Sequence, residues 1–211
     1  NRGSITINAT PYTGDYDGAA HNAITSISTT PTGTTIEYAL GSGTYSTTMP
    51  TVTTAGSYTV SIRASKAGYV PKEITKTVTV STIPGGLTLS ATSGTVTYPT
   101  AKTFTVSNNV SGGTLSVTSS NTAVATVSIS GKTVTITPKV LTSDGQKVTI
   151  TVKSAATTNY KEATATYIAT VNRGSITINA TPYTGDYDGT AHNAITSIST
   201  TPTVTTLEYA L

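Results

Sequence analysis

The stretches KVTITVK (residues 147–153) and ATATYIATV (residues 163–171) decide the fold class, because both alternate polar and apolar side chains. Such alternation is typical of a half-buried β-strand that turns Val, Ile and Tyr inward and Thr outward. Threonine suits the outer face because it is β-branched and can still form hydrogen bonds to water. The two runs therefore predict two strands that each have one face in a core.

The same alternation recurs along most of the chain, and no window of about eleven residues shows apolar positions at helical spacing. Turn-forming segments separate the runs, among them TGDYDG, PTGT, GSG, AGS, SGG, ISGK and SDGQ. About seven short strands in about 85 residues predict a β-sandwich. The fold class is thus all-β with very little helix. The other alternating runs are SITINA (4–9), YTVSIRA (58–64), KTVTV (76–80), LTLSA (87–91), TFTVS (103–107) and KTVTITP (132–138).

The first forty residues recur at the end of the chain, since residues 172–211 match residues 1–40 at all but three positions. The exchanges are Ala19/Thr190, Gly33/Val204 and Ile36/Leu207. The two copies lie 171 residues apart. That spacing is too long for one unit of a solenoid, and it suits a repeat made of two small domains. We predict one sandwich over residues 1–83, a second over residues 84–171, and the incomplete first half of another first-type domain over residues 172–211. Pro84-Gly85-Gly86 is the expected short, stiff junction, and the chain is expected to be a window of a longer protein.

Two sequence patterns resemble known families. The second unit carries SSNTAVATVSISGKTVTITPK (119–139) and resembles the group-two bacterial immunoglobulin-like (Big) domains over most of residues 87–171. The first unit, with YTGDYDGAAHNAI and AGSYTVSIRASKAGYVPKEITKTVTV, is similar to another bacterial immunoglobulin-like repeat of Gram-positive surface proteins. Ala55 departs from that pattern, where Asp often stands. The resemblance implies tandem Ig-like sandwiches arranged end to end, display and adhesion at a cell surface, and no catalysis.

Composition favours an extracellular protein, on a bacterial cell surface or secreted. Only 10% of residues are charged, against roughly 25% in an average soluble protein. The absence of Cys excludes a disulfide framework and a thiolate metal site. The 12 basic and 9 acidic residues form no cluster, so no nucleic-acid partner is expected. No apolar run reaches the roughly 18 residues that a membrane span needs.

The motif YTGDYDG, followed by His21, admits two interpretations. As a turn, it would pack Tyr12 and Tyr16 on the sandwich edge, with His21 hydrogen-bonded nearby. As a site, its acidic residues could bind calcium or act with His21 in acid–base chemistry. Calcium needs six to eight oxygen ligands, so two carboxylates make a thin set, and the turn is the preferred interpretation. No metal, cofactor or catalytic residue is therefore predicted; the weak metal candidates are Asp15, Asp17, Asp186 and Asp188.

Other polar residues give few further candidates. Tyr45, in the GSGTYSTT loop, is the best exposed aromatic for a sugar ligand. Self-formed crosslinks occur in some Gram-positive Ig-like domains, but we expect none here; the possible partners would be Lys66, Lys72, Lys76 and Gln146. Four carboxylates are expected to stand isolated and to keep the surface soluble: Glu37, Glu73, Asp144 and Glu162. Glu73 and Glu162 each follow a Lys near the start of a final strand, which predicts a common topology for both units.

The favoured function is a structural spacer in a long, repetitive bacterial surface or extracellular fibre or adhesin protein. The partners would be neighbouring Ig-like repeats of the same chain or of identical chains, with a host or glycan ligand unidentified. The alternatives are an accessory module of a secreted carbohydrate-active enzyme and a ligand-binding adhesin domain. No enzymatic activity is expected of the chain itself.

Residues 172–211 supply roughly three strands of a sandwich, too few to bury their apolar side chains. We therefore expect the missing strands to come from beyond Leu211 or from a neighbouring chain. A second sheet should then lie against Ile176, Ile178 and Ile195. The other inward candidates are Tyr183, Tyr187, Ile198, Leu207, Tyr209 and Leu211.

Overall fold

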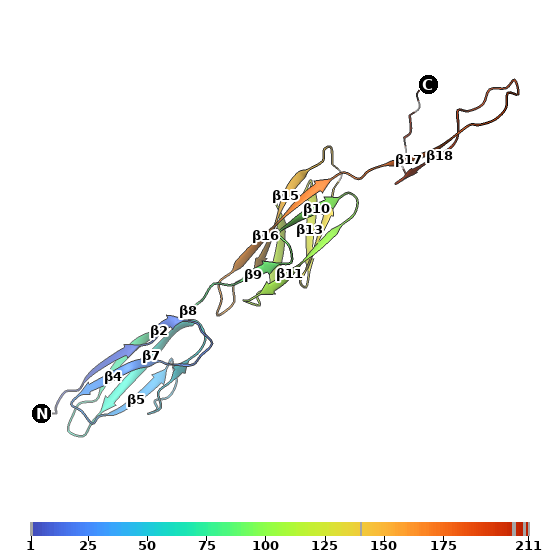
Figure 1. Cartoon of the computed structure of the whole chain (residues 1–211). Coiled ribbons are helices and arrows are strands. Elements are labelled where there is room, and N and C mark those ends of the chain that lie inside the picture. The colour runs from blue at the N-terminus through green and yellow to red at the C-terminus, as the bar shows by residue number, and fades with distance from the viewer. Residues whose placement is uncertain (1, 140, 204–205, 209, 211) are drawn as a thin grey trace.

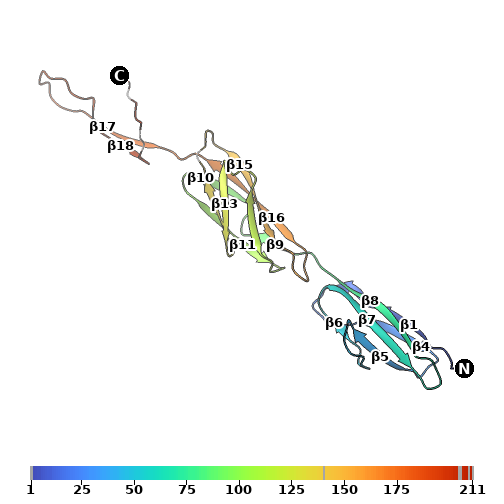
Figure 2. The ribbon, with the colours of Figure 1, turned by 180° about the vertical axis from the view of Figure 1, so that it is seen from behind.

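The computed structural model of the chain describes residues 2–139, 141–203, 206–208 and 210. Two β-sandwiches lie end to end, and a pair of antiparallel strands follows them along the same long axis (Figures 1 and 2). Every regular element in the described residues is a strand, as the alternation predicts. The chain is therefore all-β.

The first sandwich consists of a four-stranded sheet, in the order β2-β8-β7-β5, facing the pairs β1-β4 and β3-β6. Its core joins Ile5, Ile7 and Ile24 from one side to Val60 and Ile62 from the other. The strands are β1 Thr6–Pro11, β2 Thr13–Asp15, β3 His21–Asn22, β4 Ile24–Thr30, β5 Thr35–Leu40, β6 Thr51–Val52, β7 Gly56–Ser65 and β8 Lys72–Ser81.

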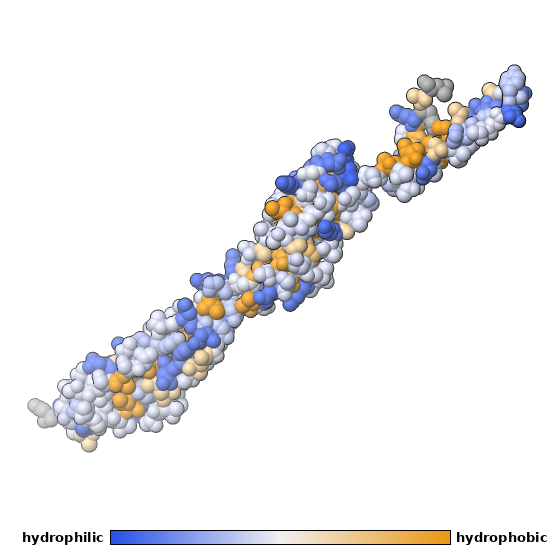
Figure 3. All heavy atoms as spheres, viewed as in Figure 1, coloured by the Kyte–Doolittle hydropathy of each residue, from blue (hydrophilic) through white to orange (hydrophobic). Residues whose placement is uncertain are grey.

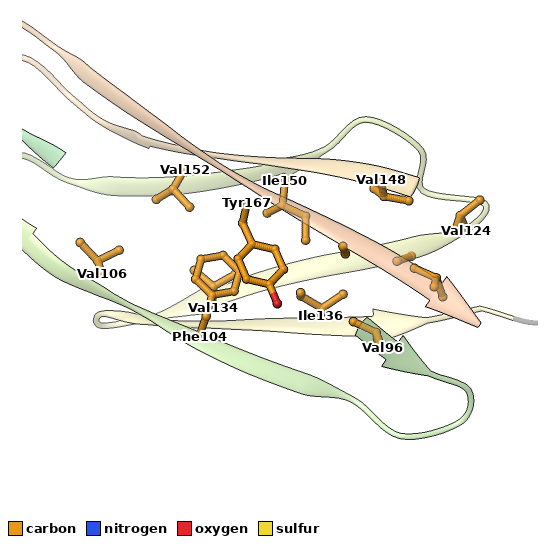
Figure 4. Close-up of a cluster of buried hydrophobic side chains, with 13 residues drawn as sticks. Val96, Phe104, Val106, Val124, Val134, Ile136, Val148, Ile150, Val152 and Tyr167 are labelled. Carbon is orange, nitrogen blue, oxygen red and sulfur yellow. The ribbon is translucent and has the colours of Figure 1, made fainter. Parts of the chain in front are cut away.

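The second sandwich packs the sheet β10-β16-β15-β12 on the sheet β13-β14-β11-β9. At its centre the rings of Phe104 and Tyr167 stack with centroids 4.3 Å apart and planes 2° from parallel (Figure 4). The strands are β9 Leu87–Leu89, β10 Ser93–Thr97, β11 Lys102–Asn109, β12 Leu115–Ser119, β13 Ala125–Ser130, β14 Thr133–Pro138, β15 Gln146–Ser154 and β16 Ala163–Asn172.

Both sandwiches share one topology at their final strands. Strand β8 pairs antiparallel with β7 and parallel with the short edge strand β2, and β16 pairs in the same way with β15 and β10. The two final strands begin beside Glu73 and Glu162, so the topology expected from these two positions is confirmed. Two facing, mainly antiparallel sheets of this kind make both units Ig-like sandwiches.

Burial along β15 shows how the alternating sequence produces the core. Val148, Ile150 and Val152 are fully buried, while Thr149 and Lys153 face solvent. Every alternating run identified in the sequence overlaps a strand.

The AGS and SDGQ segments mark breaks between strands as predicted, but each differs from a simple turn. The AGS segment opens strand β7 because Gly56 pairs with Val80. The SDGQ segment crosses from the sheet of β14 to the sheet of β15, so it closes no hairpin. The ISGK turn does close a hairpin, between β13 and β14, where Gly131 adopts a φ of 56°.

Most tyrosines are less buried than their alternating positions suggest. Tyr38 and Tyr167 lie in the cores, whereas Tyr12, Tyr16 and Tyr45 are half-buried. A hydroxyl group on a long ring favours positions near the rim, where the ring packs and the oxygen reaches a partner or water.

The strands β17 (Thr177–Pro182) and β18 (Ile195–Thr201) form a separate antiparallel pair after the second sandwich. Ile176 is 57% exposed and Ile178 is 58% exposed, while Ile195 is half-buried. In the described part of this chain no second sheet lies against these strands, so the cover expected for the three isoleucines is not found. Tyr209 and Leu211 lie outside the described residues.

Candidate functional site

The motif YTGDYDG covers β2 and the start of the loop that leads to β3, and Asp17 organises that loop. One oxygen of Asp17, Oδ1, accepts a hydrogen bond from the Ala19 backbone N–H at 2.8 Å and lies 2.9 Å from His21 Nε2. Gly18 takes a φ of 83°, which a residue with a side chain rarely adopts. This is the geometry of a turn with His21 hydrogen-bonded nearby.

Tyr12, the first residue of the motif, packs its ring against the His21 end of the loop. Its ring stacks on His21, with centroids 4.2 Å apart and planes 11° from parallel. Its hydroxyl lies over Gly14, where an added Cβ would come within 2.5 Å of the oxygen. The glycine is therefore required for the tyrosine to reach this position.

The hydrogen bond from His21, and next that from the Ala19 N–H, lower the pKa of Asp17 below its ordinary value of 3.8. Both interactions favour the carboxylate, which is the anion. Among the described residues, no three His, Cys, Asp or Glu side chains gather in a group that could hold a metal ion. Asp17 in this arrangement fixes the shape of a loop.

The second copy of the motif has the same internal geometry. Tyr183 stacks on His192 at 4.2 Å and 11°, and His192 Nε2 lies 2.9 Å from Asp188 Oδ1. Thr190 donates to that oxygen from both its backbone N–H and its hydroxyl. These bonds lower the pKa of Asp188, with the Thr190 backbone N–H as the largest cause.

Tyr16 packs against the core of the first sandwich and also contacts the second. Its backbone N–H donates to Ser81 O at 2.9 Å, which fixes the backbone at the end of β8. Its ring meets the ring of Tyr160 edge to face, with centroids 5.8 Å apart and planes 73° apart. The sequence places the two tyrosines in different units, so nothing in the local pattern indicated their contact.

The loop that carries Tyr160 also holds the junction between the sandwiches. Asn159 accepts hydrogen bonds at its side-chain oxygen from Ala55 N–H (2.9 Å) and at its backbone oxygen from Ile83 N–H (3.1 Å). Lys161 N–H donates to Ile83 O at 2.8 Å. An added Cβ on Gly85 would lie 2.3 Å from Lys161 O, so the linker needs glycine there to lie so close.

Tyr45, the candidate for a sugar ligand, has its polar and aromatic groups engaged within the first sandwich. Its hydroxyl donates to Glu73 at 2.5 Å, and the guanidinium carbon of Arg63 lies 4.3 Å from the ring centroid. The hydrogen bond to Glu73 is the main cause that raises the pKa of Tyr45. A sugar that stacked on this ring face would have to displace the arginine.

The four carboxylates expected to stand isolated all have partners, so that expectation was wrong. Glu73 accepts from Tyr45, and the other three form ion pairs. The pairs are Glu37–Arg63 at 2.9 Å, Glu162–Lys153 at 2.6 Å and Asp144–Arg173 at 3.1 Å. Long cationic side chains from neighbouring strands or from the next segment reach them, which a search for local charge clusters does not detect.

The residues considered for crosslinks have ordinary surroundings. Lys66 Nζ donates to the backbone oxygen of Thr32, and Gln146 Nε2 donates to Ser143 Oγ at 3.1 Å. Lys72 and Lys76 lie on β8 at exposed and half-buried positions.

A hydrophobic hollow lies on the face of the β17–β18 pair. Its lining includes Ile178, Ile195, Ile198 and Leu207. Figure 3 shows hydrophobic residues at the surface in this region of the chain. The counterpart of Ile178 in the first sandwich is Ile7, which the core covers. The hollow is thus the face that an Ig-like core covers in the first copy.

No protein-family model matches this chain, and no curated protein matches it. Solved structures do match. Domains 4 and 5 of the S-layer protein SbsC are 25% identical over 68% of this chain and 78% of that chain, with a TM-score of 0.34. A longer structure of SbsC (31–844) is 20% identical over 89% of this chain, with a TM-score of 0.36, and the match spans 36% of its length.

The titin domains Z1Z2, solved in complex with telethonin, are 14% identical over 80% of this chain and 98% of that chain, with a TM-score of 0.40. Because these TM-scores are low, the fold assignment depends on the sheets and cores described above. None of the described residues forms a helix with the length and apolar character of a membrane span.

Proposed function

We propose that this chain is a structural spacer within a long repetitive protein on a bacterial cell surface or outside the cell. The observation that carries the proposal is the end-to-end order of the sandwiches, with a hydrogen-bonded junction between the first two (Figure 1). Stacking domains along one axis adds length without adding a chemical site. The near-identical segments 1–40 and 172–211 support this, because repetition multiplies length.

The surface chemistry suits the same role. Thr and Ser occupy many outward positions of the strands, and four carboxylates, those of Glu37, Glu73, Asp144 and Glu162, pair with neighbouring Arg, Tyr or Lys side chains. With only 10% of residues charged and no cluster of Lys or Arg, such a surface attracts neither nucleic acid nor counterions strongly. The proposed partners are therefore other Ig-like repeats, and the proposal assigns the chain no catalytic activity.

Small-angle X-ray scattering of the chain, together with glycan and matrix-protein arrays, tests the proposal. A spacer should scatter as an elongated particle and should bind no arrayed ligand saturably. Saturable binding to an arrayed ligand would favour an adhesin domain over a spacer if Tyr45→Ala abolished it. Tyr98→Ala, at another tyrosine, is the control and should leave such binding intact. A compact particle would contradict the spacer directly.

A further inference from the structure

We propose that the motif YTGDYDG…H is a docking element that fixes the first sandwich against the loop 157–162 of the second. The motif presents Tyr16, and the loop presents Asn159 and Tyr160. The inference concerns the orientation of two neighbouring sandwiches, and it stands whether or not the chain is a surface spacer.

The first step is that the loop is organised without its partner. In both copies the Tyr–His stack has the same spacing and angle, and the Asp–His distance is 2.9 Å. Among the described residues, the first copy's motif contacts a second-type sandwich through Tyr16, and no such contact is found for the motif of the second copy. A loop that already holds its binding conformation loses little conformational entropy on docking.

The second step is the difference in exposure between Tyr16 and Tyr187, which occupy the same position in the two copies of the motif. Tyr187 is 97% exposed, whereas its counterpart Tyr16 is half-buried against Tyr160. The sequence around them, YTGDYDG, is identical. Tyr16 is covered by the ring of Tyr160 together with the core of its own sandwich, whereas Tyr187 has neither cover and shows the same docking element open.

The third step is that the contact has more than one point. Residues 159–161 touch the first sandwich at Tyr16 in the β2–β3 loop, at Ala55 before β7 and at Ile83 after β8. One contact would leave rotation free, but three contacts from separate segments restrict both bending and twisting. The partner that fits this end of the first sandwich is thus a turn with an Asn, which bonds Ala55 and Ile83, followed by a Tyr, which meets the motif at Tyr16, as in the sequence TTNYKE.

The experiment measures the distance between the two sandwiches in the full chain. The chain has no Cys, so Thr59→Cys on β7 and Thr105→Cys on β11, both exposed positions, would each take one spin label. Pulsed electron paramagnetic resonance then gives the distribution of distances between the labels. The docked chain should give one narrow distribution.

Tyr16→Ala should broaden that distribution about twofold, since sandwiches without a firm interface move relative to each other. Asn159→Ala should broaden it as well, and Tyr16→Phe should leave it narrow because the ring is kept. Tyr187→Ala is the matched control, with the same residue in the same motif but no covering ring, and should change nothing. Circular dichroism checks that each variant keeps its strands. If Tyr16→Ala fails to fold, Tyr160→Ala removes the same ring contact by truncating its partner in the second sandwich.

The inference is overturned if Tyr16→Ala or Tyr160→Ala, together with Asn159→Ala, leaves the distribution as narrow as in the parent chain. The linker alone would then set the orientation. It is equally overturned if Tyr187→Ala broadens the distribution as much as Tyr16→Ala does.

Discussion

Residues 1–40 and 172–211 share nearly one sequence and lie in two different environments. Strands β1 and β4 pair in the same register as β17 and β18, and both pairs shift register at the same place, between Thr10 and Pro11 and between Thr181 and Pro182. Burial differs sharply, because Ile7 is 8% exposed while Ile178 is 58% exposed. The short-range sequence therefore sets the pairing, and the rest of the first sandwich supplies the core.

The strands that lack a counterpart make the same point. In the first copy β2, β3 and β5 pair with β8, β6 and β7, which all lie outside the repeated forty residues. In the second copy the described residues at the corresponding positions (184–186, 192–193, 206–208 and 210) are in no strand. A segment can thus keep one strand pair and one loop on its own, whereas its other strands need partners from elsewhere.

The largest expected difference between the copies is in amide hydrogen exchange. An isolated two-stranded pair is only marginally stable, so amides of β18 should exchange about a thousandfold faster than the corresponding amides of β4. Nuclear magnetic resonance of the chain in deuterated water measures both sets in one sample. Amides of β15, in a complete sandwich, serve as the slow reference, and equal protection of β4 and β18 would contradict the comparison.

Truncation of one isoleucine in each copy tests the burial directly. Ile7→Ala should lower the free energy of unfolding of the first sandwich by about 2–4 kcal/mol, since it leaves a cavity in a packed core. Ile178→Ala, at an exposed position, should change the unfolding of either sandwich by no more than about 0.5 kcal/mol. Urea unfolding followed at the amide signals of β7 gives both values, and similar losses for the two variants would mean that Ile178 is covered in solution.

Much of this fold follows from the sequence because alternation is a local property. Runs such as KVTITVK and KTVTITP predict their strands, and the Gly in ISGK predicts its hairpin. The sequence does not show which strands meet. The parallel pairing of β2 with β8 joins segments far apart along the chain, and the SDGQ segment has the composition of a hairpin although it connects two sheets.

In the candidate site, too, contacts between residues close in sequence were easier to predict than contacts between different units. The bond between Asp17 and His21 spans four residues, and the turn composition of YTGDYDG predicts a hydrogen-bonded His21 although it does not name the partner. The contact of Tyr16 with Tyr160 and the ion pair of Asp144 with Arg173 join different units. Such contacts depend on how the units are placed, which residue types and spacing do not encode.

Gly14 and Gly185 occupy the same position in the two copies, and substituting each one tests how firmly the nearby tyrosine is held by its surroundings. In Gly14→Ala the new Cβ would come within 2.5 Å of the Tyr12 hydroxyl, and that half-buried ring packs against the first core. We expect the first sandwich to lose about 1 kcal/mol, as is usual for overpacking. Gly185→Ala should cost the chain almost nothing, because Tyr183 can turn toward solvent. Calorimetry measures the unfolding of both variants. A larger loss of stability for Gly185→Ala than for Gly14→Ala would contradict this prediction.

The smallest expected effect comes from the exchange of Ala19 for Thr190. Thr190 adds a hydroxyl that donates to Asp188 Oδ1 at 2.8 Å, a bond that Ala19 cannot make to Asp17. Hydrogen bonds to a carboxylate lower its pKa, so Thr190→Ala should raise the pKa of Asp188, and Ala19→Thr should lower that of Asp17 further.

The pKa values of both aspartates are already below 3.8 in the folded chain, so their contribution to stability is present above that pH. It is lost as the pH falls through the folded pKa, because a neutral carboxylic acid accepts these hydrogen bonds more weakly than the carboxylate does. Titration of the side-chain carboxyl carbon signals measures each pKa, and Ala19→Ser is the control that restores a hydroxyl without the methyl group. If Thr190→Ala leaves the Asp188 titration unchanged, the backbone N–H and His192 alone hold the loop, and the two copies are equivalent at this position.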